Sequence, residues 1–232
     1  MLLAFECVAR SASACVIADG REIAYGDLAG GEAEKGLVAL LDGLIRTHGK
    51  PTALAVALGP GSFTGLRIGI TAARTLAWIE NIPVHGVDAL AALAAEHGDG
   101  LWWVLLPLKK DTTFHGLFRV VDGVLQTLMP SAACLDAQMP QLHPETVQAT
   151  AIGPALAAKP ELAARWCAGV RRGDAALVTA RGVARLALQV PAKAWSVILP
   201  EYHQQPAPVL QMAALRDRDQ APPPSRPPGA QQ

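Results

Sequence analysis

The most informative segment of this chain is the block Gly59-Pro60-Gly61-Ser62-Phe63-Thr64-Gly65-Leu66-Arg67-Ile68-Gly69. It stands between a short apolar run, residues 52–58, that is typical of a buried strand, and a proline-free run, residues 63–80, that is compatible with a helix. The block is therefore expected to form a strand-to-helix turn. Glycine permits the close backbone approach that such a turn needs, and a serine suits the cap of the following helix.

A turn of this kind directs backbone N–H groups toward the helix N-terminus, where an anion such as phosphate is favoured. The sequence argues against two known motifs. A Walker loop ends in Gly-Lys-Ser/Thr, whereas Leu-Arg follows Gly65. A nucleophile elbow needs glycine two residues on either side of a serine, and Ser62 has proline and threonine there. The residues that we expect to define the loop are Gly59, Pro60, Gly61, Ser62, Thr64 and Arg67.

Small residues recur every four positions along the expected helix 63–80, at Gly65, Gly69, Ala73 and Ala77. This spacing places them in one ridge on a single helix face. The ridge has two interpretations, which are packing against the sheet of the chain itself and contact with a helix of another protein. If the ridge contacts another protein, a bulky residue at Gly69 would block pairing and leave the monomer folded. If the ridge packs on the chain's own sheet, the same change would unfold the monomer as well. Two arginines within the segment argue against a membrane span.

The composition indicates a globular protein. The chain has 232 residues, of which 51% are hydrophobic and 17% charged, enough for one large or two small domains with cores. Twenty basic and twenty acidic residues leave no global field to hold a nucleic acid. Four cysteines without Cys-x-x-Cys spacing are expected to be reduced thiols of a cytoplasmic protein. No signal-peptide pattern and no apolar run of about 20 residues is seen, so no membrane partner is expected.

The sequence pattern of the first half predicts three strands, then a helix, and then alternating strands and helices. Helix 32–48 carries apolar residues at helical spacing, and Asp88 is the expected cap of an alanine-rich helix that runs to about residue 97. The tight turn Asp19-Gly20 joins two of the strands. The expected strands of this half are 2–8, 13–18, 21–25, 52–58 and 83–87.

The second half repeats the start of the first in reduced form. Strands are expected at 101–106, 112–121 and 124–129, and residues 131–147 are broken by two prolines. A strand at 147–152 and helices near 160–167 and 174–190 are expected to follow. Proline recurs from residue 204 onward, so residues 204–232 are expected to be a flexible tail.

Two such halves predict an α/β protein with a duplicated ribonuclease-H-like, actin-like ATPase fold, in which two lobes have mixed sheets flanked by helices. The glycine block, the segment Ile82-Pro83-Val84-His85-Gly86-Val87-Asp88-Ala89-Leu90 and the late Pro200-Glu201-Tyr202 resemble the bacterial TsaB (YeaZ) family. The resemblance runs over about residues 2–203. We expect a first lobe at 1–99, a second lobe at 100–203 and the tail at 204–232.

The resemblance implies a non-catalytic subunit of the actin, sugar kinase and Hsp70-like superfamily. Such a subunit supports TsaD in threonylcarbamoyl transfer to adenosine 37 of tRNA. It implies pairing with TsaD through helices 32–48 and 63–80, TsaE in a larger complex, indirect contact with tRNA, and a homodimer when TsaD is absent. ATP and metal are expected on TsaD, with no cofactor on this chain. The implied interface residues are Leu37, Leu41, Leu44, Gly65, Gly69 and Ala73.

The chain departs from the family pattern at three places. Glu6-Cys7-Val8 stands where the family has Asp-Thr-Ser or Asp-Thr-Ala, Glu32-Ala33-Glu34 where it has a His-Ser-Glu type of sequence, and Pro107-Leu108-Lys109 where it has Asp-Ala-Arg. None of the six histidines forms the His-x-x-x-His spacing of a metal site. We therefore assign no catalytic and no metal-ligating residue.

Two other functions remain open. A small-molecule kinase or ATPase of the same superfamily needs an acidic pair for Mg²⁺, for which Asp88 and Asp111 are the candidates. A tRNA-binding module needs a basic cluster, although a solvated helix face accounts for the same residues. That cluster is Arg165, Arg171, Arg172, Arg181 and Arg185.

Overall fold

The computed structural model describes residues 1–8 and 11–201. The first half builds a five-stranded mixed sheet in the order β3-β2-β1-β4-β5. Strands β1, β2 and β3 are antiparallel, while β4 and β5 run parallel to β1. The strands are β1 (Leu2–Glu6), β2 (Ala12–Ala18), β3 (Arg21–Leu28), β4 (Ala53–Gly59) and β5 (Val84–Asp88), and the helices are α1 (Ala33–His48), α2 (Phe63–Glu80) and α3 (Ala89–His97).

The second half builds a second five-stranded sheet in the order β10-β9-β6-β7-β8. A 3₁₀ helix, η1 (Pro144–Gln148), precedes β9, and another, η2 (Trp195–Val197), follows the last helix. The strands are β6 (Gly100–Lys109), β7 (Thr112–Val121), β8 (Val124–Leu135), β9 (Thr150–Ile152) and β10 (Arg171–Arg172), and the helices are α4 (Ala155–Ala158), α5 (Leu162–Trp166) and α6 (Ala180–Ala187).

The two sheets have equivalent topologies. Strands β6, β7, β8, β9 and β10 occupy the places of β1, β2, β3, β4 and β5, with the same antiparallel and parallel pairings. The β2–β3 and β7–β8 hairpins each turn at an Asp-Gly pair with positive φ, 49° and 73° at Asp19-Gly20 and 51° and 74° at Asp122-Gly123, as a two-residue turn between twisted strands requires. The prediction of a duplicated α/β fold with two mixed sheets is confirmed.

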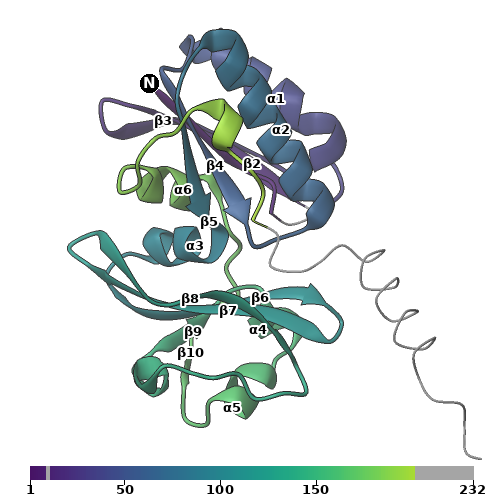
Figure 1. The fold of residues 1–232 in the computed structure, drawn as a ribbon, viewed down its shortest axis with the longest axis vertical. Coiled ribbons are helices and arrows are strands. Elements are labelled where there is room, and N and C mark those ends of the chain that lie inside the picture. Colours follow the sequence, from purple (N-terminus) through teal and green to yellow (C-terminus); the bar gives the residue numbers. More distant parts are fainter. Residues whose placement is uncertain (9–10, 202–232) are drawn as a thin grey trace, which may run out of the picture.

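The elements form five layers (Figure 1). Helices α1 and α2 cover one face of the first sheet, α3 and α6 lie between the two sheets, and α4 and α5 cover the far face of the second sheet. Side chains alternate accordingly along β6, because successive residues of a strand point to opposite faces. Trp103 and Leu105 join the core beneath α5, whereas Val104 and Leu106 join the larger core that contains α3.

The last helix crosses back to the first lobe. Helix α6 packs against β1, β2, β4 and β5, and the chain beyond it pairs with β5 through a bridge between Val84 and Lys193. The backbone N–H of Glu201 then donates to the carbonyl of Leu58 at 2.9 Å. The division into lobes at residues 99 and 100 remains a prediction. It follows the two sheets but separates α6 from the sheet on which it packs.

Several predicted elements need correction. Residues 144–148 form η1, so the strand expected at 147–152 is reduced to β9, because Pro144 begins a 3₁₀ turn. Strand β8 continues to Leu135 through residues expected to be irregular. The helices expected near 160–167 and 174–190 are the shorter α5 and α6. The predicted tail and Tyr202 lie outside the described residues. No helix in the described part of the chain has the length and hydrophobicity of a membrane span.

Candidate partner interface

An apolar groove lies between α1 and α2 on the side away from the first sheet. Helix α1 is amphipathic, and its buried residues Leu37 and Leu41 face the sheet. The groove has a volume of about 650 Å³, and Val38 and Ile79 at its borders are 71% and 64% exposed. It is lined by Val38, Leu41, Asp42, Ile45, Arg67, Ile68, Thr71, Ala72, Thr75, Leu76 and Ile79.

Helix α2 is apolar on two adjacent stripes. The ridge of small residues is buried, and a Cβ atom on Gly69 would lie 3.3 Å from Cβ of Cys7, beside Val56 of the first sheet. The neighbouring stripe, formed by Ile68, Ala72, Leu76 and Ile79, points into the groove. The ridge therefore serves close packing of α2 on its own sheet, which is the first of the two interpretations given above.

The predicted interface residues consequently need correction. The first sheet covers the glycines and alanine of the ridge, Leu37 is only 1% exposed, and Leu44 packs against the same core. Of the predicted set, only Leu41 lines the groove. A partner could not reach Leu37 or the small residues of the ridge in this structure, because the fold already covers them, whereas Leu44 is only partly buried. The residues corrected are Leu37, Gly65, Gly69 and Ala73, and Leu44 stays a prediction.

The glycine block forms the predicted strand-to-helix turn. Ser62 caps α2, since its Oγ accepts a hydrogen bond from the N–H of Gly65 at 3.4 Å. The Ser62 N–H donates to the carbonyl of Val8 at 2.7 Å. A Cβ atom on Gly61 would lie 2.6 Å from that same carbonyl oxygen, so a side chain there would clash with the end of the first strand.

The remaining loop residues lie at the two ends of the block. Gly59 has φ of 133°, and a Cβ atom there would lie 2.8 Å from the carbonyl oxygen of Glu201. Pro60 is buried beside it and follows a cis peptide bond. Thr64 is exposed, and the guanidinium of Arg67 lies 3.9 Å from the ring centroid of Phe63, where it borders the groove. The block thus joins three backbone segments and leads into the helix that forms the groove.

The end of β1 carries a buried carboxyl group. Glu6 is 1% exposed, and its oxygens accept hydrogen bonds from the N–H of Val8 at 3.0 Å and from the hydroxyl of Ser13 at 2.8 Å. Burial raises the pKa of Glu6 from its ordinary 4.5 to about 7, although both hydrogen bonds oppose that rise. Both oxygens are thus engaged within the protein at the position where the sequence departs from the family pattern.

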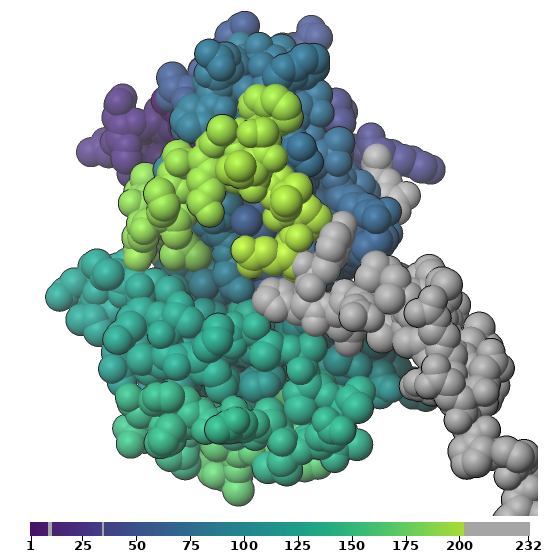
Figure 2. Space-filling model, viewed as in Figure 1, coloured from purple at the N-terminus to yellow at the C-terminus, as the bar shows by residue number. Residues whose placement is uncertain are grey.

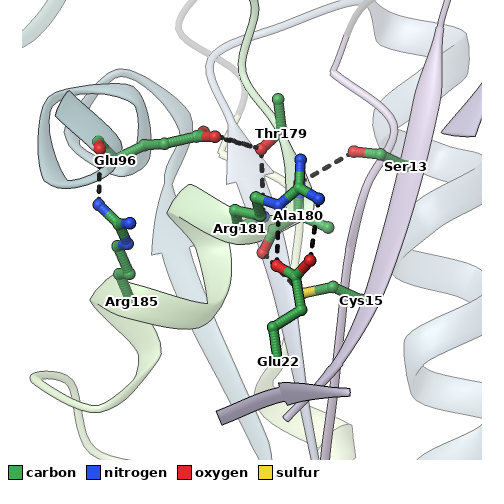
Figure 3. Close-up of polar contacts among 8 residues, drawn as sticks. All are labelled: Ser13, Cys15, Glu22, Glu96, Thr179, Ala180, Arg181 and Arg185. Atoms are coloured by element: carbon green, nitrogen blue, oxygen red, sulfur yellow. Dashed lines mark hydrogen bonds and ion pairs between the residues drawn. The ribbon is translucent and has the colours of Figure 1, made fainter. Parts of the chain in front are cut away.

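A polar network joins the first lobe to the start of α6 (Figure 3). The N–H of Ala180 donates to Oγ of Ser13 at 2.9 Å, and the thiol of Cys15 donates to the Ala180 carbonyl at 3.3 Å. The guanidinium of Arg181 donates to both carboxylate oxygens of Glu22 at 2.8 Å. That bidentate contact lowers the pKa of Glu22. These bonds fix α6 on the first sheet.

Helix α3 contributes the other side of this network. The hydroxyl of Thr179 donates to the carboxylate of Glu96 at 2.7 and 2.9 Å, and Arg185 donates to the Glu96 carbonyl at 2.6 Å. Burial raises the pKa of the Cys15 thiol to about 12, so this thiol stays protonated at neutral pH. The network therefore connects strands β2 and β3 with both central helices.

The candidate residues of the two alternative functions are engaged in local structure. The Asp88 carboxylate caps α3 by accepting from the N–H of Ala91 at 2.8 Å, and Asp111 accepts from the hydroxyl of Thr112. Residues 1–8 and 11–201 contain no group of three or more His, Cys, Asp or Glu side chains placed to hold a metal ion.

The arginines of the predicted basic cluster mostly bind acceptors of this chain. Arg165, Arg171 and Arg172 donate to backbone carbonyls of the second lobe, while Arg181 and Arg185 belong to the network beside α3. These arginines do not form one basic surface, because Arg165, Arg171 and Arg172 bind groups of the second lobe, whereas Arg181 and Arg185 lie on α6 against the first sheet.

A family model for TsaD, tRNA N6-adenosine threonylcarbamoyltransferase, matches residues 45–106, which include the last turn of α1, the glycine block and α2. A curated protein of Bacillus subtilis is 42% identical over 79 residues, covering 33% of this chain and 34% of that protein. One of Escherichia coli is 32% identical over 105 residues, covering 44% of each chain. Both carry the name tRNA threonylcarbamoyladenosine biosynthesis protein TsaB. The chain is similar to TsaB.

The predicted resemblance is thus confirmed, and these sequence matches span about a third to under a half of the length of the curated TsaB proteins. Solved structures extend the likeness of the fold over nearly the whole described chain. YeaZ from Pseudomonas aeruginosa has a TM-score of 0.71 at 21% identity, covering 87% of this chain and 98% of that one. A second solved structure, described as a protein with similarity to peptidase YEAZ from Pseudomonas aeruginosa, has a TM-score of 0.74 at 21% identity, covering 88% of this chain and 99% of that one.

Sequence reasoning missed the groove itself. Val38, Ile68, Leu76 and Ile79 were not among the expected interface residues, although all line it. A usable signal was present, because Ile68, Ala72, Leu76 and Ile79 follow helical spacing, and the first three each stand one residue before a member of the small ridge. A helix with one stripe on its sheet and an adjacent apolar stripe needs a second partner surface.

Proposed function

We propose that this chain is a non-catalytic subunit that binds a TsaD-type catalytic subunit through the α1–α2 groove. In this role it supports threonylcarbamoyl transfer to adenosine 37 of tRNA. The observation that carries the proposal is the uncovered apolar groove between α1 and α2, the second of which begins within the glycine block. The names of the matched TsaB relatives supply the pathway, since both are threonylcarbamoyladenosine biosynthesis proteins.

The physical argument for a protein partner is the chemistry of the groove. Its lining contains only Asp42 and Arg67 as charged residues, and apolar side chains at its borders stand in water. Burying apolar surface contributes about 25 cal/mol per Å². Monomeric proteins seldom leave a large contiguous apolar patch exposed. An amphipathic helix of a partner would fit the space between two helices.

The argument for an accessory role comes from the β1 end. A catalytic site of this superfamily needs free acidic groups there, whereas both Glu6 oxygens accept hydrogen bonds from Val8 and Ser13. We therefore place ATP and metal on the TsaD-type partner, with a TsaE-type protein in a larger complex. Contact with tRNA is indirect in this proposal, in keeping with balanced acidic and basic residues. The site of action is the cytoplasm, and the free chain forms a homodimer when its partner is absent.

The test uses a matched pair of valine substitutions in the full chain. Val38→Glu places a charge at the groove border, and Val124→Glu places one at a similarly exposed position, 64% against 71%, in the second lobe. Titration calorimetry with TsaD from the same organism is expected to give at least tenfold weaker binding for Val38→Glu only. A charge at a desolvated apolar contact costs more than about 1.4 kcal/mol. Equal thermal unfolding curves for the two variants serve as the folding control.

The same experiment can contradict the proposal. If the wild-type chain does not bind TsaD, or if Val38→Glu binds as tightly as Val124→Glu, the groove is not the docking site. A second readout is the threonylcarbamoyladenosine content of tRNA from cells in which each variant replaces the wild-type protein. It should fall with Val38→Glu and stay unchanged with Val124→Glu.

A further inference from the structure

A second hollow lies on the opposite flank of α2. It has a volume of about 370 Å³ and is lined by Thr71, Arg74, Thr75, Trp78 and Trp195. Thr71 and Thr75 also line the groove, so one ridge of α2 separates the two depressions. The hollow brings together a helix of the first half and the 3₁₀ turn η2 from the end of the described chain.

Large apolar side chains are exposed around this second hollow. Trp78 is 64% exposed, and Val197 and Leu199, in the segment that continues from Trp195, are 59% and 56% exposed. Figure 2 shows this segment, in yellow-green, lying across the first lobe beside the blue atoms of the first-half elements. Exposed apolar side chains thus follow one another from Ile79 at the border of the groove to Trp78 beside the hollow, with others on the C-terminal segment.

The other border of the groove is polar. Beyond Val38, the exposed residues of α1 whose burial the structure describes are small, charged or hydroxyl-bearing. These residues are Lys35, Ala39, Asp42, Gly43, Arg46 and Thr47. The two borders therefore differ in chemistry, and an apolar partner surface that fills the groove would extend over α2 rather than over α1.

The groove accounts for only part of a protein–protein interface of ordinary size. It is lined by 11 residues, whereas stable protein–protein interfaces use about 20 to 30 residues a side. The second hollow adds Arg74, Trp78 and Trp195 to those residues. Tryptophan and arginine are the residue types that most often dominate binding energy at the centre of an interface.

The hollow combines an apolar wall with a cation. The indoles of Trp78 and Trp195 are 6.4 Å apart between centroids, and the guanidinium of Arg74 lies 5.8 Å from the Trp195 centroid. Among the residues that the structure describes, no carboxylate lies within ion-pair distance of Arg74. A complementary group would present an apolar side chain to the indoles and a carboxylate to the guanidinium.

We infer that the hollow formed by Trp78, Trp195 and Arg74 is the second half of the docking surface. In this arrangement the catalytic partner straddles α2, inserting one element into the groove and an apolar side chain with an adjacent carboxylate into the hollow. This inference rests on the proposed function, because the occupant is the same TsaD-type chain. The segment after α6 then contributes directly to partner binding.

The test measures binding of full-length variants to TsaD from the same organism by titration calorimetry. Trp78→Ala is expected to weaken binding at least tenfold, as truncation of a central interface tryptophan does. Trp78→Phe should restore most of the affinity by keeping an aromatic ring. Arg74→Glu should weaken binding and remove part of its salt dependence. Val124→Ala, at an equally exposed apolar residue, should bind like wild type.

The outcomes separate this inference from the proposed function. If wild type binds, Val38→Glu does not, and Trp78→Ala binds like wild type, the groove is the interface and the inference about the hollow is overturned. If Trp78→Ala and Arg74→Glu both bind more weakly with unchanged thermal unfolding, the inference is supported. If wild type does not bind TsaD, both the proposed function and the inference fall.

Discussion

Glu6 is a carboxylic acid that the fold places almost entirely out of water. Burial disfavours its charged form, so the folded protein holds the proton up to a pKa of about 7, compared with an ordinary value of 4.5. Between these two pH values the unfolded chain has released the proton and the folded chain has not. Stability contributed by this group is therefore fully present below pH 4.5, falls as the pH rises toward 7, and is constant above that.

Glu6→Gln should remove this pH dependence. Glutamine is neutral at every pH and has the shape of the protonated acid. The stability of the variant relative to wild type is therefore expected to increase by about 3 kcal/mol between pH 4.5 and pH 8, given 1.36 kcal/mol per pKa unit. Chemical denaturation at a series of pH values measures this difference. Parallel pH profiles for the two proteins would show that Glu6 does not carry the shift.

Single residues show what the sequence could and could not predict. The positions of the helix caps at Ser62 and Asp88 were correct, because a cap depends on neighbours within three residues. The direction of the small-residue ridge was left open between two interpretations. Gly69 contacts Cys7, which is 62 positions away in the chain, and no local pattern states which side of a helix its own sheet will cover. A tryptophan at Gly69 would thus unfold the monomer rather than test an interface.

At the scale of elements, α3 and α6 approach each other very closely. A Cβ atom on Gly182 of α6 would lie 2.3 Å from the carbonyl oxygen of Ala92 in α3. All residues of α3 from Ala89 to Ala95 are buried, which is expected of a helix with packed elements on every side. The contact between the two helices therefore depends on the absence of a side chain at one position.

Gly182→Ala should destabilise the protein although alanine favours helices. The methyl group would force the two backbones apart, and overpacking of this kind costs about 1 to 3 kcal/mol. The matched control is Gly43→Ala in α1, where nothing lies within 4 Å of the added Cβ atom. That change is expected to stabilise by about 0.5 to 1 kcal/mol through helix propensity. Thermal or chemical denaturation measures both, and a stabilising Gly182→Ala would refute the packing argument.

Elements of the first half were predicted better than those of the second. Helices α1 and α2 have 16 and 18 residues and a clear apolar spacing. In the second half, β10 has two residues, α4 has four and α5 has five. Elements that short carry no full period of a hydrophobic pattern. Their form is set by Trp103 and Trp166, around which the second core packs.

At the scale of the whole molecule, the last helix of each half packs against the sheet of the other half. Helix α6 packs on the first sheet, while α3 contacts β6, β7 and β8 of the second sheet as well as β4 and β5. The duplication could be predicted from the repeated strand pattern. The exchange of helices could not, because α6 joins the first lobe through contacts such as Ala180 with Ser13, which are 167 positions apart.

Residues 1–99 alone should therefore fail to fold cooperatively. Without α6, the face of the first sheet that holds Glu6 and Cys15 would be open to water, and α3 would lack the second sheet. Circular dichroism during heating is expected to show a sharp transition for residues 1–201 and a gradual one for residues 1–99. A sharp transition of the shorter fragment would mean that the first lobe is independently stable.

The exchange of helices also bears on how the protein is made. The first sheet receives its covering helix only after the ribosome has moved from residue 99 to residue 187. At about 5 to 20 residues per second this takes roughly 4 to 18 s. During that interval α3 is the one helix of the nascent chain available to this apolar sheet face, and the part that α6 later covers stays open. Slow codons or depletion of ribosome-associated chaperones should consequently reduce the yield of this protein more than that of a protein whose domains are complete in sequence order.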